Sequence, residues 1–113
     1  MPERRNLLFI CSRNQWRSPT AETLWRRAPH INVRSAGTSP RARRTVNASD
    51  MSWADVVFVM ENKHRKRLKS MFPQIAAHQL IHVLEIPDEY RYMDPELVDL
   101  LQVGVGDFLS QLD

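Results

Sequence analysis

Runs of apolar residues separated by polar stretches predict four β-strands along the chain. Two runs are continuous, at residues 7–10 and 56–60, which is typical of strands buried on both faces of a parallel sheet. Residues 31–35 alternate between apolar and polar side chains, and the mainly apolar segment 79–84 predicts the last strand. Residues 39–50 have no apolar period and are expected to form a loop or a short helix.

Apolar residues spaced three and four positions apart predict helices between and after these strands. The first helix is expected to start at Pro19, with Ser18 as its N-cap, and its buried face to consist of Ala21, Leu24, Trp25 and Ala28. A second is expected over 63–71, capped by Asn62 and ended by Pro73. The last is expected over 95–112, with a buried stripe of Leu97, Leu101, Val105, Phe108, Leu109 and Leu112.

The alternation of strands and helices predicts a three-layer α/β/α sandwich with a four-stranded parallel sheet. Right-handed crossovers give the strand order 2-1-3-4. The 113 residues, 42% of them hydrophobic, suit a single domain covering 1–113. No apolar run approaches the roughly 20 residues of a membrane span, and the start of the chain leaves no room for a signal peptide. Because a single cysteine suits a reducing compartment, we expect a cytoplasmic location.

The net charge of +3 is unevenly distributed along the sequence. Residues 1–84 carry 15 basic and 5 acidic side chains, whereas residues 85–113 carry 1 basic and 8 acidic side chains. A basic body of this kind attracts anionic substrates. The basic helix at 63–71 has no interleaved aromatic residues, so it is expected to be a solvated face, and a nucleic-acid partner is not favoured.

The chain's only cysteine, Cys11, lies where the first strand ends and the first helix is about to begin. Ligands of open parallel sheets bind at this edge, and amide groups at the start of a helix favour an oxyanion. The same donors, together with Arg17, favour the thiolate form of Cys11. A lone cysteine is more often a buried apolar residue, but the arginine six positions later favours a nucleophile. The phosphate-binding residues that this loop predicts are Ser12, Arg13, Asn14, Gln15, Trp16 and Ser18.

The side chains of the loop are suited to transfer of a phosphoryl group. Arg17 can hold two phosphoryl oxygens in a bidentate fork, which a lysine cannot do. Ser18 can donate to the sulfur when the sulfur becomes a leaving group, and Asn14 can fix the conformation of the loop. We therefore expect Cys11 and Arg17 to be catalytic.

The motif Cys-x5-Arg-Ser-Pro-x-Ala-Glu after an apolar strand resembles the low-molecular-weight protein tyrosine phosphatase family. Further matches are the segments 35–38 and 54–60 and an Asp-x-Tyr element before the final helix. The resemblance implies hydrolysis of phosphoproteins or small phosphomonoesters through a phosphocysteine, with no cofactor. It also implies that Asp88 protonates the leaving group and that Tyr90 and Tyr92 line the substrate pocket. Asp94, which also precedes a proline, is the alternative acid, although a helix N-cap is its simpler role.

The sequence departs from the family pattern at three places. Arg13 replaces a glycine, so a residue with positive φ is expected at this position. Trp16 replaces a frequent second cysteine, so an oxidised Cys11 has no disulfide partner within the chain. Residues 39–50 lack a helix and an aromatic loop that relatives carry, and contain the cluster Arg41, Arg43 and Arg44, which either is solvated or contacts a second anionic group.

Two further hypotheses rest on the same residues. An arsenate reductase of this shape needs an external thiol, because no second cysteine is present. A non-catalytic module that binds phosphate or nucleic acid would also suit the basic charge. A metal site is not expected, since His78 and His82 would share one face of a strand without further ligands. His30 and His64 are expected at the surface.

Overall fold

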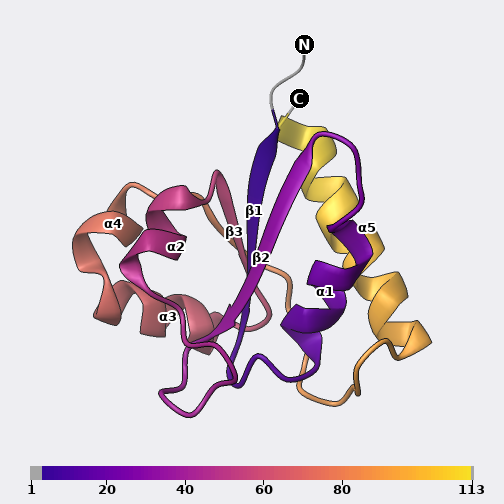
Figure 1. Ribbon diagram of the computed structural model, residues 1–113, viewed down its shortest axis with the longest axis horizontal. Coiled ribbons are helices and arrows are strands. Elements are labelled where there is room, and N and C mark those ends of the chain that lie inside the picture. Colours follow the sequence, from indigo (N-terminus) through magenta and orange to yellow (C-terminus); the bar gives the residue numbers. More distant parts are fainter. Residues whose placement is uncertain (1–3, 113) are drawn as a thin grey trace.

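The computed structural model describes residues 4–112, which form one parallel β-sheet covered by helices on both faces (Figure 1). The strands are β1 (Arg5–Cys11), β2 (Ile31–Gly37), β3 (Val56–Val59) and β4 (Ile81–Val83). All neighbouring strands are parallel and the order is β2-β1-β3-β4. The predicted sheet and its strand order are therefore confirmed.

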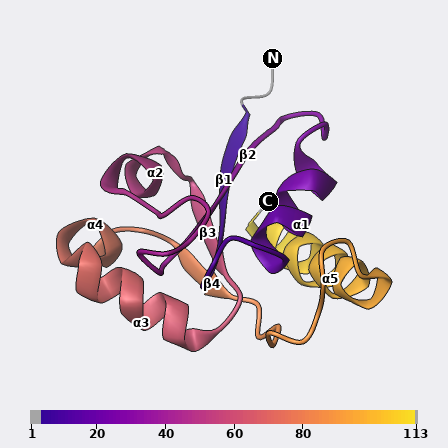
Figure 2. The same ribbon diagram turned by 60° about the horizontal axis from the view of Figure 1, so that its bottom comes forward.

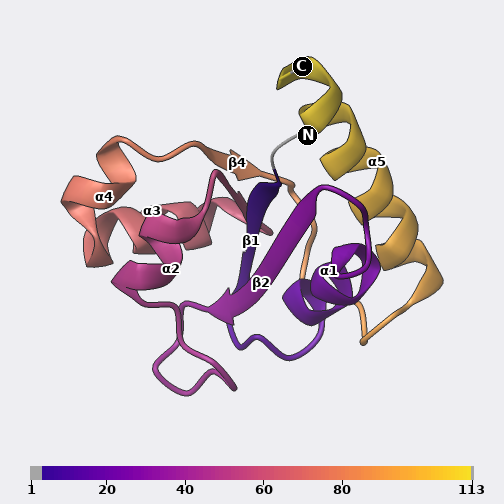
Figure 3. The same ribbon diagram turned by 45° about the horizontal axis from the view of Figure 1, so that its top comes forward.

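The helices form the two outer layers of the sandwich. Figures 1 and 3 show α1 (Arg17–Trp25) and α5 (Pro95–Leu112) on one face of the sheet. The other face is covered by α2 (Ala48–Trp53), α3 (Asn62–Met71) and α4 (Pro73–Ala77). Within residues 4–112, no helix combines the length and the apolar character needed to cross a bilayer.

The central strand β1 is buried on both faces because its side chains alternate between two hydrophobic clusters. Leu7 and Phe9 belong to the cluster beneath α1 and α5, and Leu8 and Ile10 belong to the other cluster. Phe9 stacks on Phe58, with ring centroids 5.3 Å apart. This double burial explains why the β1 sequence is continuously apolar, and it fixes the position of the loop that follows.

The first helix differs from the prediction at its start. α1 begins at Arg17, so Ser18 lies inside the first turn and is not the N-cap. The Ser18 side chain is fully buried and its hydroxyl bonds to groups of the preceding loop. Tertiary contacts thus redirect the hydroxyl that was expected to cap the helix.

Other element boundaries also differ from the expectations. Pro73, which was expected only to end the preceding helix, is the first residue of an additional helix, α4. Proline is favoured in the first turn of a helix. The last strand is shorter than expected, and His78 therefore lies before it. The cap of α3 is Glu61, and Asn62 is already helical. On α5 the predicted stripe is buried at Leu97, Leu101 and Val105 and partly buried at Phe108 and Leu109, whereas Leu112 is 43% exposed.

The carboxyl ends of the strands meet at one edge of the sheet, which comes forward in Figure 2. Four connections lie there: the β1–α1 loop, the β2–α2 connection, the short β3–α3 connection and the segment between β4 and α5. The backbone of this last segment continues along β3, since Leu84 N–H donates to Val59 and Ile86 N–H donates to Met60. Groups from distant parts of the sequence are thereby brought to one place.

Asp94 caps α5 in the way predicted for a residue before Pro95. Its Oδ1 accepts a hydrogen bond from Glu96 N–H at 2.9 Å, and its carbonyl accepts one from Val98 N–H. Replacing a capping aspartate by alanine costs about 1 kcal/mol. Asp94→Ala is therefore expected to lower the free energy of unfolding by about that amount in urea titrations, whereas Asp99→Ala, within the same helix, is expected to have a smaller effect. Equal losses would contradict the capping role.

Candidate active site

The loop between β1 and α1 is held from outside by the β2–α2 connection. The carbonyl oxygens of residues 11–13 accept hydrogen bonds from the backbone N–H groups of Thr38, Ser39 and Arg43, at 3.0 to 3.1 Å. In a trans peptide the carbonyl and the following N–H point in opposite directions. Outward carbonyls therefore turn the N–H groups of residues 12–14 inward, and an inward ring of N–H groups is an arrangement that can accept an anion.

Asn14 fixes the bend of this loop. Its φ of 52° lies in the left-handed region, which asparagine tolerates better than most residues. The expectation of a positive φ at Arg13 is therefore wrong, since the reversal occurs one residue later. The buried Asn14 amide donates to the hydroxyls of Ser18 and Ser35, both at 2.9 Å, and the Ser35 hydroxyl donates to Glu22.

Ser18 contacts the sulfur of Cys11. The Ser18 Oγ accepts from Asn14 and lies 3.0 Å from Cys11 Sγ. Because Ser18 Oγ accepts from Asn14, its own hydrogen has two acceptors within reach, the Cys11 sulfur at 3.0 Å and the Ala36 carbonyl at 3.4 Å. The contact with the sulfur would stabilise a negative charge on Cys11.

Gly37, the partner of Cys11 in the sheet register, allows the loop and β2 to approach closely. A Cβ atom at this position would lie 2.5 Å from the Ser12 carbonyl oxygen and 2.6 Å from the Ala42 Cβ. Such distances are not tolerated by a side chain. The Ser-Ala-Gly-Thr segment noted in the sequence is therefore explained by close packing against the loop.

Arg17 is held by groups from two other elements. Its side chain is 2% exposed, and Nη1 donates to Glu61 Oε2 at 2.6 Å and to the Ile86 carbonyl at 2.8 Å. Its Nε lies 3.7 Å from Asp88 Oδ1. Burial alone would raise the pKa of Glu61, but the hydrogen bond and the charge of Arg17 hold that pKa below its ordinary value.

His64 is a buried part of the site, so the expectation of a surface histidine is wrong. Only 1% of its surface is exposed, and its Nδ1 accepts the Glu61 N–H at 3.0 Å. Nε2 must then carry the hydrogen of the neutral ring, and it lies 2.8 Å from the Ser12 hydroxyl. Burial, followed by the positive charge of Arg17, lowers the pKa of His64 to about 4.

Glu61 and His64 were not identified from the sequence as site residues. Their position in the sequence could have indicated a role in the site, because both come shortly after the buried strand β3, at the sheet edge where ligands bind. The basic residues of α3 predict a solvated face, and this pattern hides the buried position of His64 within the helix. Only the packing of α3 against the β1–α1 loop distinguishes His64 from its charged neighbours.

A small hollow of about 30 Å³ lies over the loop. Its walls come from the loop, the first residue of α1 and the segment after β4, and they consist of Cys11, Ser12, Arg13, Gln15, Trp16, Arg17 and Asp88. Asn14 and Ser18, expected to bind phosphate, are buried and bonded to other groups of the site. Asp88 is therefore at the hollow, whereas Asp94 caps α5.

The two tyrosines expected in the substrate pocket lie in different surroundings. Tyr90 is partly buried and packs against the hydrophobic cluster beneath α1 and α5. Tyr92 is 50% exposed, and its hydroxyl lies 2.7 Å from the Thr23 hydroxyl on α1. It contributes to a larger hollow beside the loop, together with Trp16.

The histidines considered as metal ligands occupy other roles. His82 stacks on Phe108 with ring centroids 4.2 Å apart, and His78 is exposed in the turn before β4. In the part of the chain that the structure describes, no three His, Cys, Asp or Glu side chains are grouped to hold a metal ion.

Comparison with known proteins finds sequence relatives among the low molecular weight protein-tyrosine-phosphatases. The chain is 29% identical, over 115 aligned positions, to the low molecular weight protein-tyrosine-phosphatase Wzb of Escherichia coli K12, with 76% of this chain and 78% of the relative covered. No protein-family model matches the chain.

Solved structures share the fold. The chain superposes on the low molecular weight protein tyrosine phosphatase SP-PTP from Streptococcus pyogenes with a TM-score of 0.79 and 20% identity, covering 96% of this chain and 93% of that one. It superposes on the YwlE arginine phosphatase from Geobacillus stearothermophilus with a TM-score of 0.68 and 20% identity, covering 96% of each chain. The architecture thus occurs with different phosphorylated substrates.

The buried neutral His64 predicts a specific dependence of stability on pH. In the unfolded chain a histidine titrates near 6.5, whereas in the folded protein the pKa of His64 is about 4. The unfolded state therefore binds more protons between these values, and the free energy of unfolding falls by roughly 3 kcal/mol as the pH is lowered across this window.

Urea titrations of the wild type and of His64→Gln between pH 7 and pH 4 test this contribution. The variant is expected to be less stable at pH 7, and its difference from the wild type is expected to shrink as the pH falls. His78→Gln, at an exposed position, is the control and should follow the wild type. A constant difference between wild type and His64→Gln would contradict the prediction.

Proposed function

We propose that this member of the low-molecular-weight protein-tyrosine-phosphatase family hydrolyses phosphomonoesters through a phosphocysteine intermediate formed on Cys11. The observation that carries the proposal is the hollow in which Cys11, Arg17 and Asp88 meet inward-facing N–H groups of the loop. Its small volume suits a phosphoryl group better than a whole substrate.

Arg17 is prepared to hold the phosphoryl group. Glu61 and the Ile86 carbonyl occupy Nη1, whereas the edge formed by Nε and Nη2 makes no hydrogen bond within the described residues and has the Asp88 carboxylate 3.7 Å from Nε. Two phosphoryl oxygens can bind at this edge. The Glu61 carboxylate compensates the charge of the buried guanidinium and keeps it in one orientation. Such preorganised donors stabilise the charge of the transferring group without rearranging during the reaction.

In the first step, the Cys11 thiolate attacks phosphorus in line with the ester oxygen. The bond between sulfur and phosphorus forms while the ester bond breaks, and Asp88 gives its proton to the leaving oxygen. Arg17 and the loop N–H groups hold the three equatorial oxygens. The alcohol or phenol then leaves.

In the second step, water attacks the phosphocysteine. The Asp88 carboxylate accepts a proton from the water, the bond between sulfur and phosphorus breaks, and inorganic phosphate is released. The Ser18 hydroxyl, 3.0 Å from Cys11 Sγ, donates to the departing thiolate. Only groups of the chain and water take part, so we propose no cofactor.

Phosphotyrosine proteins and small phosphomonoesters are both compatible with this site, and Tyr92 is the aromatic residue that we propose at its rim. Because catalysis needs a reduced cysteine, we propose that the protein acts in the cytoplasm. Arsenate reduction with an external thiol and binding of phosphate without turnover remain the alternatives, but Asp88 at the hollow favours hydrolysis, since neither alternative needs a general acid there.

Cys11→Ser and Arg17→Lys test the nucleophile and the guanidinium fork. With p-nitrophenyl phosphate, Cys11→Ser is expected to reduce turnover to the background rate, and Arg17→Lys to lower kcat by about 100-fold or more, because lysine lacks the fork. Arg27→Lys is the matched control, since Arg27 is exposed and lies outside the hollow. Turnover that survives in a folded Cys11→Ser variant would overturn the mechanism.

Asp88→Asn tests the general acid through two leaving groups. Phenolate needs a proton when it leaves, whereas p-nitrophenolate is a much weaker base. The variant is therefore expected to lose about 100-fold in kcat/KM for phenyl phosphate and clearly less for p-nitrophenyl phosphate. Equal losses for the two substrates would argue against proton donation, and a selective loss in Asp94→Asn instead would transfer the role to Asp94.

A further inference from the structure

A second and larger hollow, of about 550 Å³, lies beside the phosphate-sized one. It is bounded by α1, the end of the β1–α1 loop, the β2–α2 connection and the segment before α5, and it is lined by Gln15, Trp16, Pro19, Glu22, Thr23, Arg26, Arg43 and Tyr92. We call it the lateral groove. It shares Gln15 and Trp16 with the small hollow, so the two hollows adjoin, and a substrate with its phosphate over Cys11 can extend into this groove.

The two aromatic residues of the lateral groove are exposed. Trp16 is 37% exposed and Tyr92 is 50% exposed. The hydroxyl of Tyr92 bonds to Thr23, which fixes its ring against α1. The groove thus offers apolar rings on which a flat or extended leaving group can pack.

The charged residues of the lateral groove differ in whether they have hydrogen-bond or ion-pair partners within the protein. Arg26 and Arg43 have no side-chain hydrogen bond or ion pair within residues 4–112. Glu22 is the only acidic lining residue, and its carboxylate accepts the Ser35 hydroxyl. The groove therefore carries a net positive charge with two available guanidinium groups.

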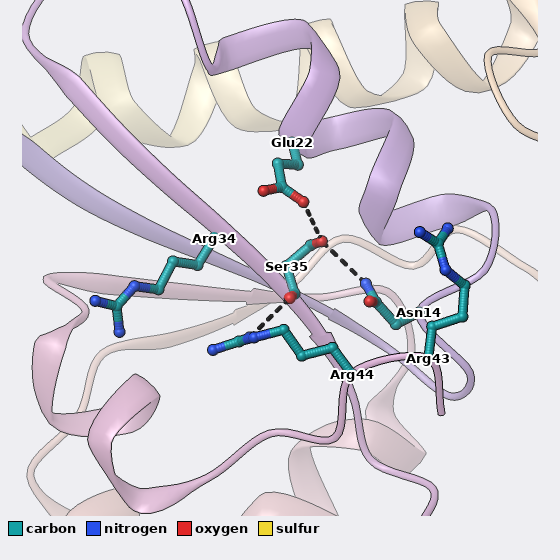
Figure 4. Close-up of a pocket in the computed structure, with 6 residues that line it drawn as sticks. All are labelled: Asn14, Glu22, Arg34, Ser35, Arg43 and Arg44. Carbon is teal, nitrogen blue, oxygen red and sulfur yellow. Dashed lines mark hydrogen bonds between the residues drawn. The ribbon is translucent and has the colours of Figure 1, made fainter. Parts of the chain in front are cut away.

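Two other arginines near Arg43 are occupied. Arg34 and Arg44 both pair with the buried carboxylate of Asp50, and Arg44 also donates to the Ser35 carbonyl. Figure 4 shows Arg43 extending along α1, away from Arg34 and Arg44. Of the Arg41, Arg43 and Arg44 cluster, only Arg43 lines the lateral groove.

We propose that the lateral groove binds a second anionic group on the substrate, and that Arg43, with Arg26, recognises it. The substrate class is a phosphomonoester whose leaving group carries a carboxylate or a further phosphate beside an apolar body. This inference rests on the proposed function, because it places the reacting phosphate over Cys11. The second anion would come either from an acidic residue next to a phosphotyrosine or from a small metabolite.

The experiment compares substrates that share one leaving group. N-acetyl-phosphotyrosine carries a carboxylate that its amide lacks, and a phosphotyrosine peptide flanked by glutamates differs in the same way from one flanked by glutamines. The wild type is expected to prefer the anionic member of at least one pair by about five-fold in kcat/KM. Arg43→Gln is expected to abolish that preference, and Arg27→Gln, an exposed charge change outside the groove, to retain it.

The results distinguish the two possible sources of the second anion, and they also show whether the lateral groove binds an anion at all. A preference only in the peptide pair identifies an acidic phosphopeptide, and a preference in the small pair identifies a metabolite-sized substrate. Equal kcat/KM within both pairs, or a preference that Arg43→Gln and Arg27→Gln reduce alike, would overturn the lateral groove as an anion site while leaving the phosphatase in place.

Binding to the Cys11→Ser variant, measured by calorimetry with the same four compounds, does not need turnover. If p-nitrophenyl phosphate were not hydrolysed by the wild type, the proposed function would fail. The anion site would then stand if Cys11→Ser bound the anionic members more tightly and adding Arg43→Gln removed the difference, and it would fall if all four compounds bound alike.

Discussion

The site depends on the hydrogen bonds that hold the carbonyl groups of the β1–α1 loop outward. Three of these carbonyls are bound by N–H groups of the β2–α2 connection, and the peptide plane then directs the following N–H groups inward. Without this support, the N–H groups would be free to bond to one another's carbonyls or to water. The close approach that the bonds need is possible because Gly37 has no side chain to separate the two segments.

A second constraint is the burial of a permanent positive charge. Arg17 is removed from solvent almost completely, and a buried guanidinium is tolerated only with partners that replace its hydration. Glu61 and the Ile86 carbonyl provide these partners on one side of the guanidinium, which leaves the other side for a ligand. His64 stays neutral in the same region because it is buried beside that charge. Charge and orientation are thus set before a substrate binds.

The remaining arginines are of two kinds: some are paired with carboxylates of the protein, and others are available to contact a substrate. Arg34 and Arg44 neutralise Asp50, a buried carboxylate that also caps α2, so their role is to support the β2–α2 connection. That connection in turn holds the β1–α1 loop. Arg43, from the same segment, has its backbone in this support and its side chain in the lateral groove. One short stretch therefore couples the stability of the loop to the surroundings of the substrate.

The sequence by itself determined the strands, the position of Cys11 at the end of β1 and the extent of α5, because hydrophobic periodicity is a local property of the chain. It also determined the strand order, because crossovers between parallel strands are right-handed. The tertiary structure alone decided the role of Ser18, which local propensity assigned to a helix cap, and the positive φ of Asn14 in place of Arg13. It alone also brought Glu61 and His64 against the loop from a helix that is largely basic and polar. Such roles follow from which buried polar groups find partners, and those partners lie up to 69 residues apart in the chain, where no sequence period can relate them.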